Sequence, residues 1–317
     1  MNKKCLYCFK DLSRERSGEY HEQCSLAFFG TKQQPDFSYR LEQMDELARN
    51  VINRSIAVPG VQPKISLSLV NNTLEDSKNG RLTVVGALGG NYIFKPPSQY
   101  FPQLPENEHL TMKMADSFGI KTAQSSLIRL KSGELSFITK RFDRTEKGKK
   151  LHMIDMYQIL DAFDKYKSSM EKVGKAVGQY SSLPMFDKLY YFELAVFSFV
   201  TGNNDMHLKN FSMLLTDGNW RLAPAYDLLN VTIANPDDKD ELALTLEGKR
   251  KKLELQHFLR FGANLGLNDK QIQKVFQKFG AFHEHAKQQI AQSFLSSEYR
   301  ESYAQLMIDR YKALHLI

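Results

Sequence analysis

Carboxylate and amide side chains are concentrated in one stretch of the chain, residues 201–227. Asp205 and Asn210 form the pattern D-x4-N, and two short apolar runs that follow are separated by Asp217-Gly218, which predicts a β-hairpin. A hairpin returns its second strand to the level of its start, so we expect Asp227 to lie beside Asn210. Carboxylate and amide oxygens of this kind suit Mg²⁺. The pattern predicts a phosphoryl-transfer site, in which Asp205 accepts a proton while Asn210 and Asp227 hold metal on nucleotide phosphates.

An alternative is that Asp205, Asn210 and Asp217 only cap turns, as such residues commonly do in loops. The D-x4-N pattern alone has little specificity. It is the hairpin ending in Asp227 that favours the functional interpretation.

Lys95 ends a strand-like run, Tyr92–Lys95, directly before two prolines. A lysine on a strand edge is well placed to meet α- and β-phosphates, and it needs a carboxylate to hold it. Residues 106–118 carry apolar side chains four positions apart and are followed by Gly119, which predicts a helix with a glycine C-cap. Glu108, in the first turn, is the candidate partner of Lys95. The alternative is that the acids there only favour the helix dipole.

Upstream of Lys95, a loop that contains Gly60 and two prolines leads to Lys64 and then to an alternating, strand-like run. The backbone N–H groups of a glycine loop can approach phosphate closely, although an ordinary turn explains the same residues. Segments with strand character are 65–69, 82–85, 91–94, 126–130 and 135–142. Segments with helical periodicity are 157–163, 188–200, 253–265, 269–282 and 297–316.

A strand-rich first part and a mainly helical second part, with an acidic loop in the latter, indicate a kinase-like plan. We therefore predict an α+β, two-lobed, protein-kinase-like fold. The predicted domains are an N-terminal segment (1–50), an N-lobe (51–143) and a helical C-lobe (144–317).

Composition is that of a soluble globular protein: 317 residues, 42% hydrophobic and 25% charged. A net charge of +7 and a pI near 9.1 permit nucleotide or nucleic-acid partners without requiring them. The N-terminus has no signal-peptide core, and no stretch has membrane-spanning length. We expect a cytoplasmic protein with no membrane partner.

All three cysteines lie near the N-terminus, as Cys5-x2-Cys8 followed by His21-x2-Cys24. Three thiolates and an imidazole in this order could close a tetrahedral zinc site, and four protein ligands would make it structural. The alternative is that the cysteines are ordinary small buried residues.

Six motifs follow one another in the chain between residues 55 and 230. They are Gly60-x-Gln-Pro-Lys64, Ile93-Phe-Lys95-Pro, Glu106-Asn-Glu108-His, Lys140-Arg-Phe-Asp-Arg144, Gly202-Asn-Asn-Asp205-x-His207-x-Lys-Asn210 and Ala225-Tyr-Asp227-Leu. Together they resemble one family, the HipA-type serine/threonine kinases of bacterial toxin–antitoxin systems. The short N-terminal part is more similar to HipT, the compact toxin of HipBST systems, than to full-length HipA.

The resemblance implies a role for each matched position. Asp205 would be the catalytic base, Asn210 and Asp227 the Mg²⁺ ligands, and Lys95 the lysine that binds the ATP phosphates. The remaining implied ATP-site positions are the glycine motif (Gly60, Lys64), Glu108, a hinge that meets adenine through its backbone (Lys140, Arg141, Phe142), Gln158 near the ribose, and His207 as a support for the loop.

The resemblance also implies regulation and partners. Family members are silenced by autophosphorylation of a serine before the glycine motif, but here Ala57-Val-Pro59 precedes Gly60, which leaves Ser55 as the nearest candidate. HipS-like and HipB-like antitoxins would be the partners, with DNA contacted only through the antitoxin. The implied substrate is an aminoacyl-tRNA synthetase or another translation protein.

Two other classes of function remain open from the sequence. The same site could phosphorylate a small molecule. The chain could instead be a catalytically dormant binding module in an antitoxin–DNA complex, for which the basic charge and the Cys/His cluster would be the supporting features.

Overall fold

The computed structural model describes residues 3–13, 18–44, 46, 64–70, 80–85, 89–145 and 148–317. The chain forms two compact units. The first, which is strand-rich, comprises Met1–His109, Ala123–Gly148 and Gln292–Phe294, and the second, mainly helical, comprises Leu110–Thr122, Lys149–Ala291 and Leu295–Ile317. Helix α3 (Leu104–Phe118) begins in the first unit and ends in the second.

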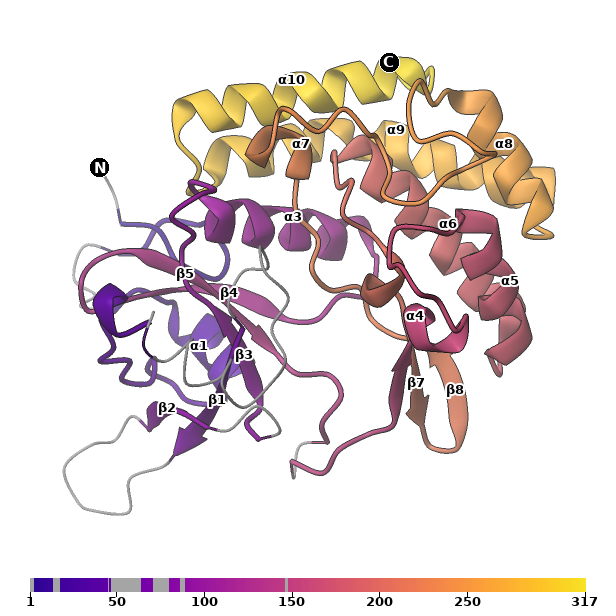
Figure 1. The fold of residues 1–317 in the computed structure, drawn as a ribbon. Coiled ribbons are helices and arrows are strands. Elements are labelled where there is room, and N and C mark those ends of the chain that lie inside the picture. Colours follow the sequence, from indigo (N-terminus) through magenta and orange to yellow (C-terminus); the bar gives the residue numbers. More distant parts are fainter. Residues whose placement is uncertain are drawn as a thin grey trace. The chain divides into compact units, whose positions relative to one another are not determined.

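The strand-rich unit contains an antiparallel sheet in the order β2-β1-β3-β5-β4 (Figure 1). Every strand that the sequence predicts before residue 143 is present. The strands are β1 (Ile65–Val70), β2 (Arg81–Val84), β3 (Tyr92–Lys95), β4 (Ser125–Arg129) and β5 (Leu135–Lys140). In the register of β3 and β5, Lys95 pairs with Phe137, so the lysine lies at the end of a central strand with neighbours on both sides.

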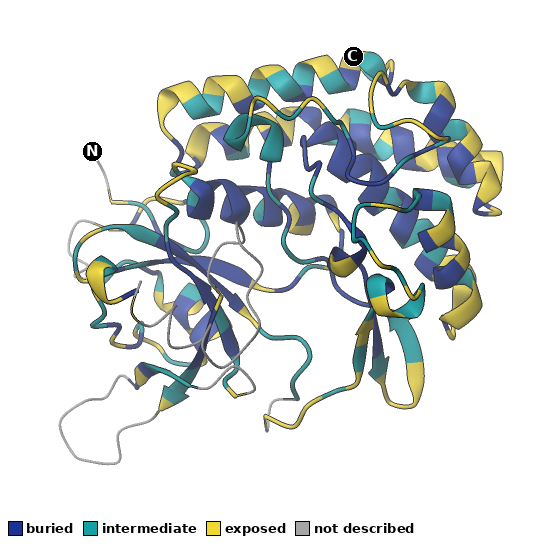
Figure 2. Cartoon of the chain, in the orientation of Figure 1, coloured by how far each residue is buried: buried dark blue, intermediate teal, exposed yellow. Residues whose placement is uncertain are grey.

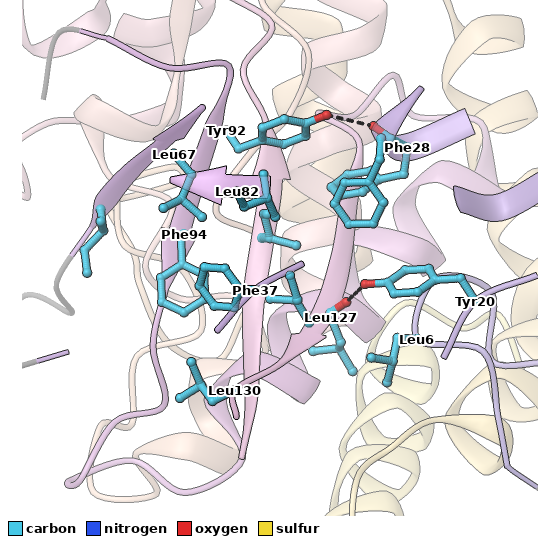
Figure 3. Packing of buried hydrophobic residues seen from close by; sticks show 14 of the residues in the cluster. Leu6, Tyr20, Phe28, Phe37, Leu67, Leu82, Tyr92, Phe94, Leu127 and Leu130 are labelled. Carbon is cyan, nitrogen blue, oxygen red and sulfur yellow. Dashed lines mark hydrogen bonds between the residues drawn. The ribbon is translucent and has the colours of Figure 1, made fainter. Parts of the chain in front are cut away.

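The N-terminal segment shares its hydrophobic core with this sheet (Figure 3). The Tyr92 hydroxyl donates to the Phe28 carbonyl oxygen at 3.2 Å, at the end of helix α1 (Glu22–Phe29). The Tyr20 hydroxyl likewise donates to the carbonyl oxygen of Leu127 in β4. Because buried tyrosines of this kind contribute apolar area as well as a hydrogen bond, they fix the segment against the sheet.

The helical unit is built around α6 (Pro184–Val200), which begins with proline in its first turn and is almost entirely buried beyond Tyr191 (Figure 2). Aromatic rings connect it to two later helices: Phe192 packs on α8 (Leu255–Asn264) and on α9 (Asp269–Gln292), and Phe199 packs on α8. The other helices are α4 (Met156–Ile159), α5 (Met170–Tyr180), α7 (Val231–Ala234), α8 (Leu255–Asn264), α9 (Asp269–Gln292) and α10 (Ser297–Ala313).

The hairpin that the sequence predicts is present as β7 (Ser212–Thr216) and β8 (Asn219–Leu222), with β6 (Met153–Asp155) on the other side of β7. Asp217 and Gly218 have φ values of 50° and 77°, as a two-residue type I′ turn requires. Asp187 of α6 is buried and accepts hydrogen bonds from the Leu222 N–H group and from Arg221. The hairpin is therefore tied to α6 by a buried carboxylate.

One predicted helix is shorter in the structure than its periodicity suggests. The helical pattern spans 157–163, but α4 ends at Ile159, and Asp161 adopts a left-handed conformation with φ of 46°. Phe163, which the pattern places on an apolar face, is 99% exposed. Within the described part of the chain, no helix is both long and apolar enough to cross a membrane.

Candidate active site

The polar loop 201–210 follows the buried end of α6, and its second residue, Gly202, could not easily be replaced by another residue type. Gly202 has φ of 69°, and an added Cβ would lie 2.3 Å from a Leu306 methyl carbon and 2.8 Å from the Asn230 side-chain oxygen. Both the backbone conformation and the lack of space therefore select glycine. The loop direction is fixed from its first turn.

Asp205 carries the carboxylate of this loop and is half-buried, with a side chain that is 39% accessible. The Tyr166 hydroxyl donates to its Oδ1 at 2.7 Å. Burial and the neighbouring Asp205 raise the pKa of Tyr166, so that hydroxyl stays protonated and remains a donor. The Asn210 amide nitrogen donates to the Asp205 carbonyl oxygen at 2.8 Å. Asp205 is thus held in place at both its backbone and its side chain, as a proton acceptor needs to be.

His207 is buried beside Asp205, with Nε2 4.0 Å from Oδ1 of the carboxylate. Burial lowers the pKa of His207 to about 4, although Asp205 and Asp227 act in the opposite direction. Its ring contacts Tyr166 edge-on at 5.1 Å, and its Nδ1 has no hydrogen-bond partner among the described residues. A neutral, buried imidazole supports the loop and is a poor proton acceptor near pH 7.

Asn210 and Asp227 lie at the two ends of the segment that forms the hairpin. Asn210 ends a short 3₁₀ helix, and because its amide nitrogen is occupied by Asp205, its amide oxygen remains as the acceptor. The Tyr226 hydroxyl donates to the Lys209 carbonyl oxygen at 2.8 Å and lies 2.6 Å from the Ser212 hydroxyl. The residue before Asp227 is therefore hydrogen-bonded to Lys209 and Ser212, which lie on either side of Asn210 in the chain. That Asp227 itself lies beside Asn210 stays a prediction.

Asp227 adopts a left-handed conformation with φ of 55°, which is uncommon for residues other than glycine, asparagine and aspartate. Such conformations often occur at functional sites, where neighbouring structure enforces them. An amide oxygen and a carboxylate, both hard donors, match the ligand preference of Mg²⁺, which retains water or phosphate for the rest of its shell. The donor chemistry of Asn210 and Asp227 fits that metal.

Lys95 and Glu108 form an ion pair of 2.6 Å inside the strand-rich unit. The lysine and glutamate side chains are only 5% and 2% exposed. The prediction that Glu108 reaches Lys95 is confirmed. The Lys95 ammonium also lies 5.2 Å from the ring centre of Phe137, its cross-strand neighbour. Two charges this deeply buried stabilise each other only as a pair.

The predicted hinge follows directly from β5. The N–H groups of Lys140 and Arg141 donate to the carbonyl oxygens of Gln124 and Asn91, both at 2.8 Å. An adenine ring at this position would have to replace those bonds or use other backbone groups. The Arg141 side chain forms a two-pronged ion pair with Asp143.

The remaining predicted positions vary in how much the structure says of them. Lys64 precedes β1 and is exposed, and Gln158 is an exposed residue of α4 whose N–H donates to Asp155. Gly60 and Ser55 lie outside the described residues. Cys5, Cys8, His21 and Cys24 come together, with their ligand atoms all within 4.8 Å of one another.

Tyr166 is one of two site residues that the sequence patterns do not identify. It lies far upstream of Asp205 and belongs to no motif with it, so only the fold brings the two side chains together. Asn203, whose side-chain oxygen lies 3.4 Å from the Asp205 nitrogen, was also missed. Its position in the triplet Asn203-Asn204-Asp205, directly before the candidate base, is the sequence feature that could have pointed to it.

Comparison with known proteins places this chain in a family. The family model described as HipA-like C-terminal domain matches residues 56–286. The protein named "Putative kinase" of Haemophilus influenzae is 27% identical over 76% of this chain and 77% of its own length. The serine/threonine-protein kinase toxin HipA of Shewanella oneidensis is 25% identical over 61% of this chain. The chain spans about half, 47%, of that toxin's length.

Two solved structures have a similar fold. HipA in the Shewanella oneidensis complex of HipA, HipB and operator DNA gives a TM-score of 0.68 at 20% identity, covering 84% of this chain and 71% of that one. The Helicobacter pylori proinflammatory kinase CtkA gives a TM-score of 0.53 at 17% identity, covering 70% and 87%. The chain belongs to the HipA-like C-terminal domain family and has an α+β, protein-kinase-like fold, as predicted.

We predict that Glu108→Gln lowers the free energy of unfolding by about 3–5 kcal/mol, because the substitution removes one charge of a buried ion pair. Urea denaturation measures this change. The double variant Lys95→Met/Glu108→Leu should recover much of the loss, since an apolar pair needs no ionic partner. As a control, Glu284→Gln in the exposed pair with Lys287 should lower the free energy of unfolding far less, because water screens that pair. Equal effects at positions 108 and 284 would contradict the prediction.

We also predict that acid destabilises the metal-free protein partly through His207. Because its pKa is lowered from 6.5 to about 4 on folding, the unfolded chain takes up the proton first as pH falls. The contribution of neutral His207 to the free energy of unfolding is complete above pH 6.5, and it is lost progressively as the pH falls to about 4. Melting temperatures of His207→Asn should therefore fall less steeply than those of the wild type across this range. Parallel curves would contradict the assignment.

Proposed function

We propose that this protein is an ATP- and Mg²⁺-dependent serine/threonine protein kinase. The observation that carries the proposal is the arrangement of the loop and hairpin in the helical unit. Asp205 is oriented by Tyr166, while Asn210 and the left-handed Asp227 stand at the two ends of the segment that forms the hairpin. This is the donor set and the division of roles that phosphoryl transfer requires.

Each residue then has one task. Asp205 accepts the proton of the attacking hydroxyl, and Tyr166 keeps its carboxylate oriented. Asn210 and Asp227 would hold Mg²⁺, which when bound neutralises charge on the nucleotide phosphates. Lys95, fixed by Glu108, contacts the α- and β-phosphates as a preorganised cation.

The remaining positions are assigned by family resemblance. The backbone of Lys140, Arg141 and Phe142 contacts adenine, and Gln158 lies near the ribose. In addition, His207 supports the loop, the segment with Gly60 and Lys64 covers the phosphates, and Ser55 is the proposed autophosphorylation site.

We further propose that the kinase acts as the toxin of a HipBST-like system in the cytoplasm. The similarity to a kinase toxin, and to a HipA structure with HipB and operator DNA, supports antitoxin partners of the HipS and HipB kinds. Contact with DNA would then run through the antitoxin. The proposed target is an aminoacyl-tRNA synthetase or another translation protein, since phosphorylation in a nucleotide-binding loop of such an enzyme would stop translation.

The test compares the wild type with Asp205→Asn in the presence of Mg²⁺ and labelled ATP, with protein and small-molecule fractions of a lysate as separate acceptors. We expect phosphate on protein serine or threonine, formed about 10²–10⁴ times more slowly by the variant because its general base is lost. Asp217→Asn is the matched control. It makes the same change in the hairpin turn, where an Asn-Gly pair is well tolerated, and should keep full activity.

Equal rates for the wild type and Asp205→Asn would contradict the role of Asp205. Labelling confined to the small-molecule fraction would replace the protein-kinase proposal with a metabolite kinase. No ATP-dependent labelling in either fraction would favour the dormant binding module instead.

A further inference from the structure

The Cys/His cluster near the N-terminus has the dimensions of a metal site. The Nδ1 atom of His21 lies 3.4 Å from the Cys8 sulfur and 3.8 Å from the Cys24 sulfur, and all four ligand atoms lie within 4.8 Å of one another. Tetrahedral zinc, with Zn–S near 2.3 Å and Zn–N near 2.0 Å, would hold its donor atoms about 3.5–3.8 Å apart. The cluster therefore needs little adjustment to close around one ion.

His21 is also oriented as a metal ligand. Its Nε2 lies 3.1 Å from the Asp11 carbonyl oxygen. A carbonyl oxygen only accepts, so Nε2 carries the proton and donates, which leaves the Nδ1 lone pair facing the cysteine sulfurs. Metal-bound histidines commonly donate their second nitrogen to a backbone carbonyl in this way. An imidazole that only filled space in a core would not need this arrangement.

The backbone around Cys5 and Cys8 forms a tight turn. The Phe9 N–H donates to the Cys5 carbonyl oxygen at 3.0 Å, and the Cys5 N–H donates to the Lys10 carbonyl oxygen at 2.9 Å. Phe9 takes a left-handed conformation with φ of 67° to close this turn, a rare state for an aromatic residue. The turn brings the sulfurs of Cys5 and Cys8 close together. The unfavourable conformation of Phe9 is part of this turn, which indicates that the surrounding structure holds the two cysteines in these positions.

The turn is bonded to the sheet and to helix α3. The Leu6 carbonyl oxygen accepts from the N–H of Leu127 in β4 at 3.2 Å. The Tyr7 carbonyl oxygen lies 3.2 Å from Nε2 of the fully buried His109, whose Nδ1 lies 3.1 Å from the Ser125 hydroxyl. Because Tyr7 stands between the two cysteines, any movement of the turn acts directly on His109.

His109 is the residue next to Glu108, the partner of Lys95. Its ring is also packed edge-on against Phe9 at 5.1 Å. The turn therefore contacts the start of α3 through a hydrogen bond and a ring contact, one residue from the buried ion pair.

We propose that Cys5, Cys8, His21 and Cys24 bind one structural Zn²⁺, and that the metal-closed turn braces the start of α3 and so positions Glu108. The metal site itself is independent of the proposed function. Its consequence for ATP binding, through Lys95, rests on that function. Four protein ligands leave no open coordination position, so the metal has a structural role and no direct part in catalysis.

The metal is tested first on the whole protein, purified without chelator. Elemental analysis should find about one zinc per chain, the stoichiometry of a closed four-ligand site. Replacement by Co²⁺ should give the visible bands of a tetrahedral thiolate complex. His21→Cys should keep both signals, because Cys₄ sites also bind zinc. His21→Ala and Cys24→Ser should bind at least about tenfold more weakly, since even an outer-shell partner is worth 10–100-fold. The control His152→Ala should be unchanged.

If the variants do not fold, the site can still be tested on the wild type, by removing the metal with a chelator and then adding Zn²⁺ back. Restored stoichiometry and cobalt bands support the site. Folded wild type that contains no zinc and gives no cobalt bands overturns it, as does unchanged affinity in both His21→Ala and Cys24→Ser.

The brace is tested by hydrogen–deuterium exchange on the wild type, with and without metal. Removal of zinc should speed exchange in residues 3–13 and also in 104–109 and 125–129, while α8 (Leu255–Asn264) stays unchanged. Faster exchange in 3–13 alone would overturn the brace and leave only a local metal site. None of these measurements uses ATP, so a failed kinase assay and a failed metal site are distinguishable.

Discussion

The structure of the strand-rich unit depends on one buried ion pair, Lys95 with Glu108. Each side chain is almost completely removed from water, and removing either partner of the pair would cost about 3–5 kcal/mol, several times the worth of a surface pair. Two elements must therefore keep their relative position: the end of β3, fixed by its register with β5, and the start of α3. The residue after Glu108 is in turn hydrogen-bonded to the Cys/His segment. An ammonium group that is held this firmly is suited to binding phosphate, because little reorganisation is needed when the anion arrives.

In the helical unit, a different constraint applies: the polar side chains of the loop 201–210 must be held in place next to an apolar core. Helix α6 ends in Gly202, whose conformation and crowded surroundings set the direction of the loop. Within the loop, Asn210 bonds back to Asp205, and Tyr166 fixes the carboxylate from outside the loop. Asp205 and Asn210 are thus positioned by hydrogen bonds within the loop and from Tyr166, which is the kind of preorganisation that phosphoryl transfer requires.

Local patterns were enough to predict much of this site. The Asp217-Gly218 turn gave the hairpin, the helix after Lys95 gave Glu108, and the spacing of the Cys/His residues gave the cluster. Contacts between distant parts of the chain left no such signal, as with Tyr166 and Asp205 or with Tyr7 and His109. The helix predicted over 157–163 ends early because Asp161 is left-handed, a backbone property that side-chain periodicity does not contain.

If Asn210 and Asp227 hold Mg²⁺ on a nucleotide, as we propose, calorimetric titration of ATP should show that Mg²⁺ strengthens binding and that this effect depends on both residues. The wild type should bind ATP more tightly with Mg²⁺ than with a chelator. In Asp227→Asn, the increase in ATP affinity that Mg²⁺ causes should be at least about tenfold smaller than in the wild type, because a neutral amide replaces the charged ligand. The affinity of this variant for ATP in the presence of chelator should stay close to that of the wild type. An equal gain from Mg²⁺ in both proteins would contradict the account.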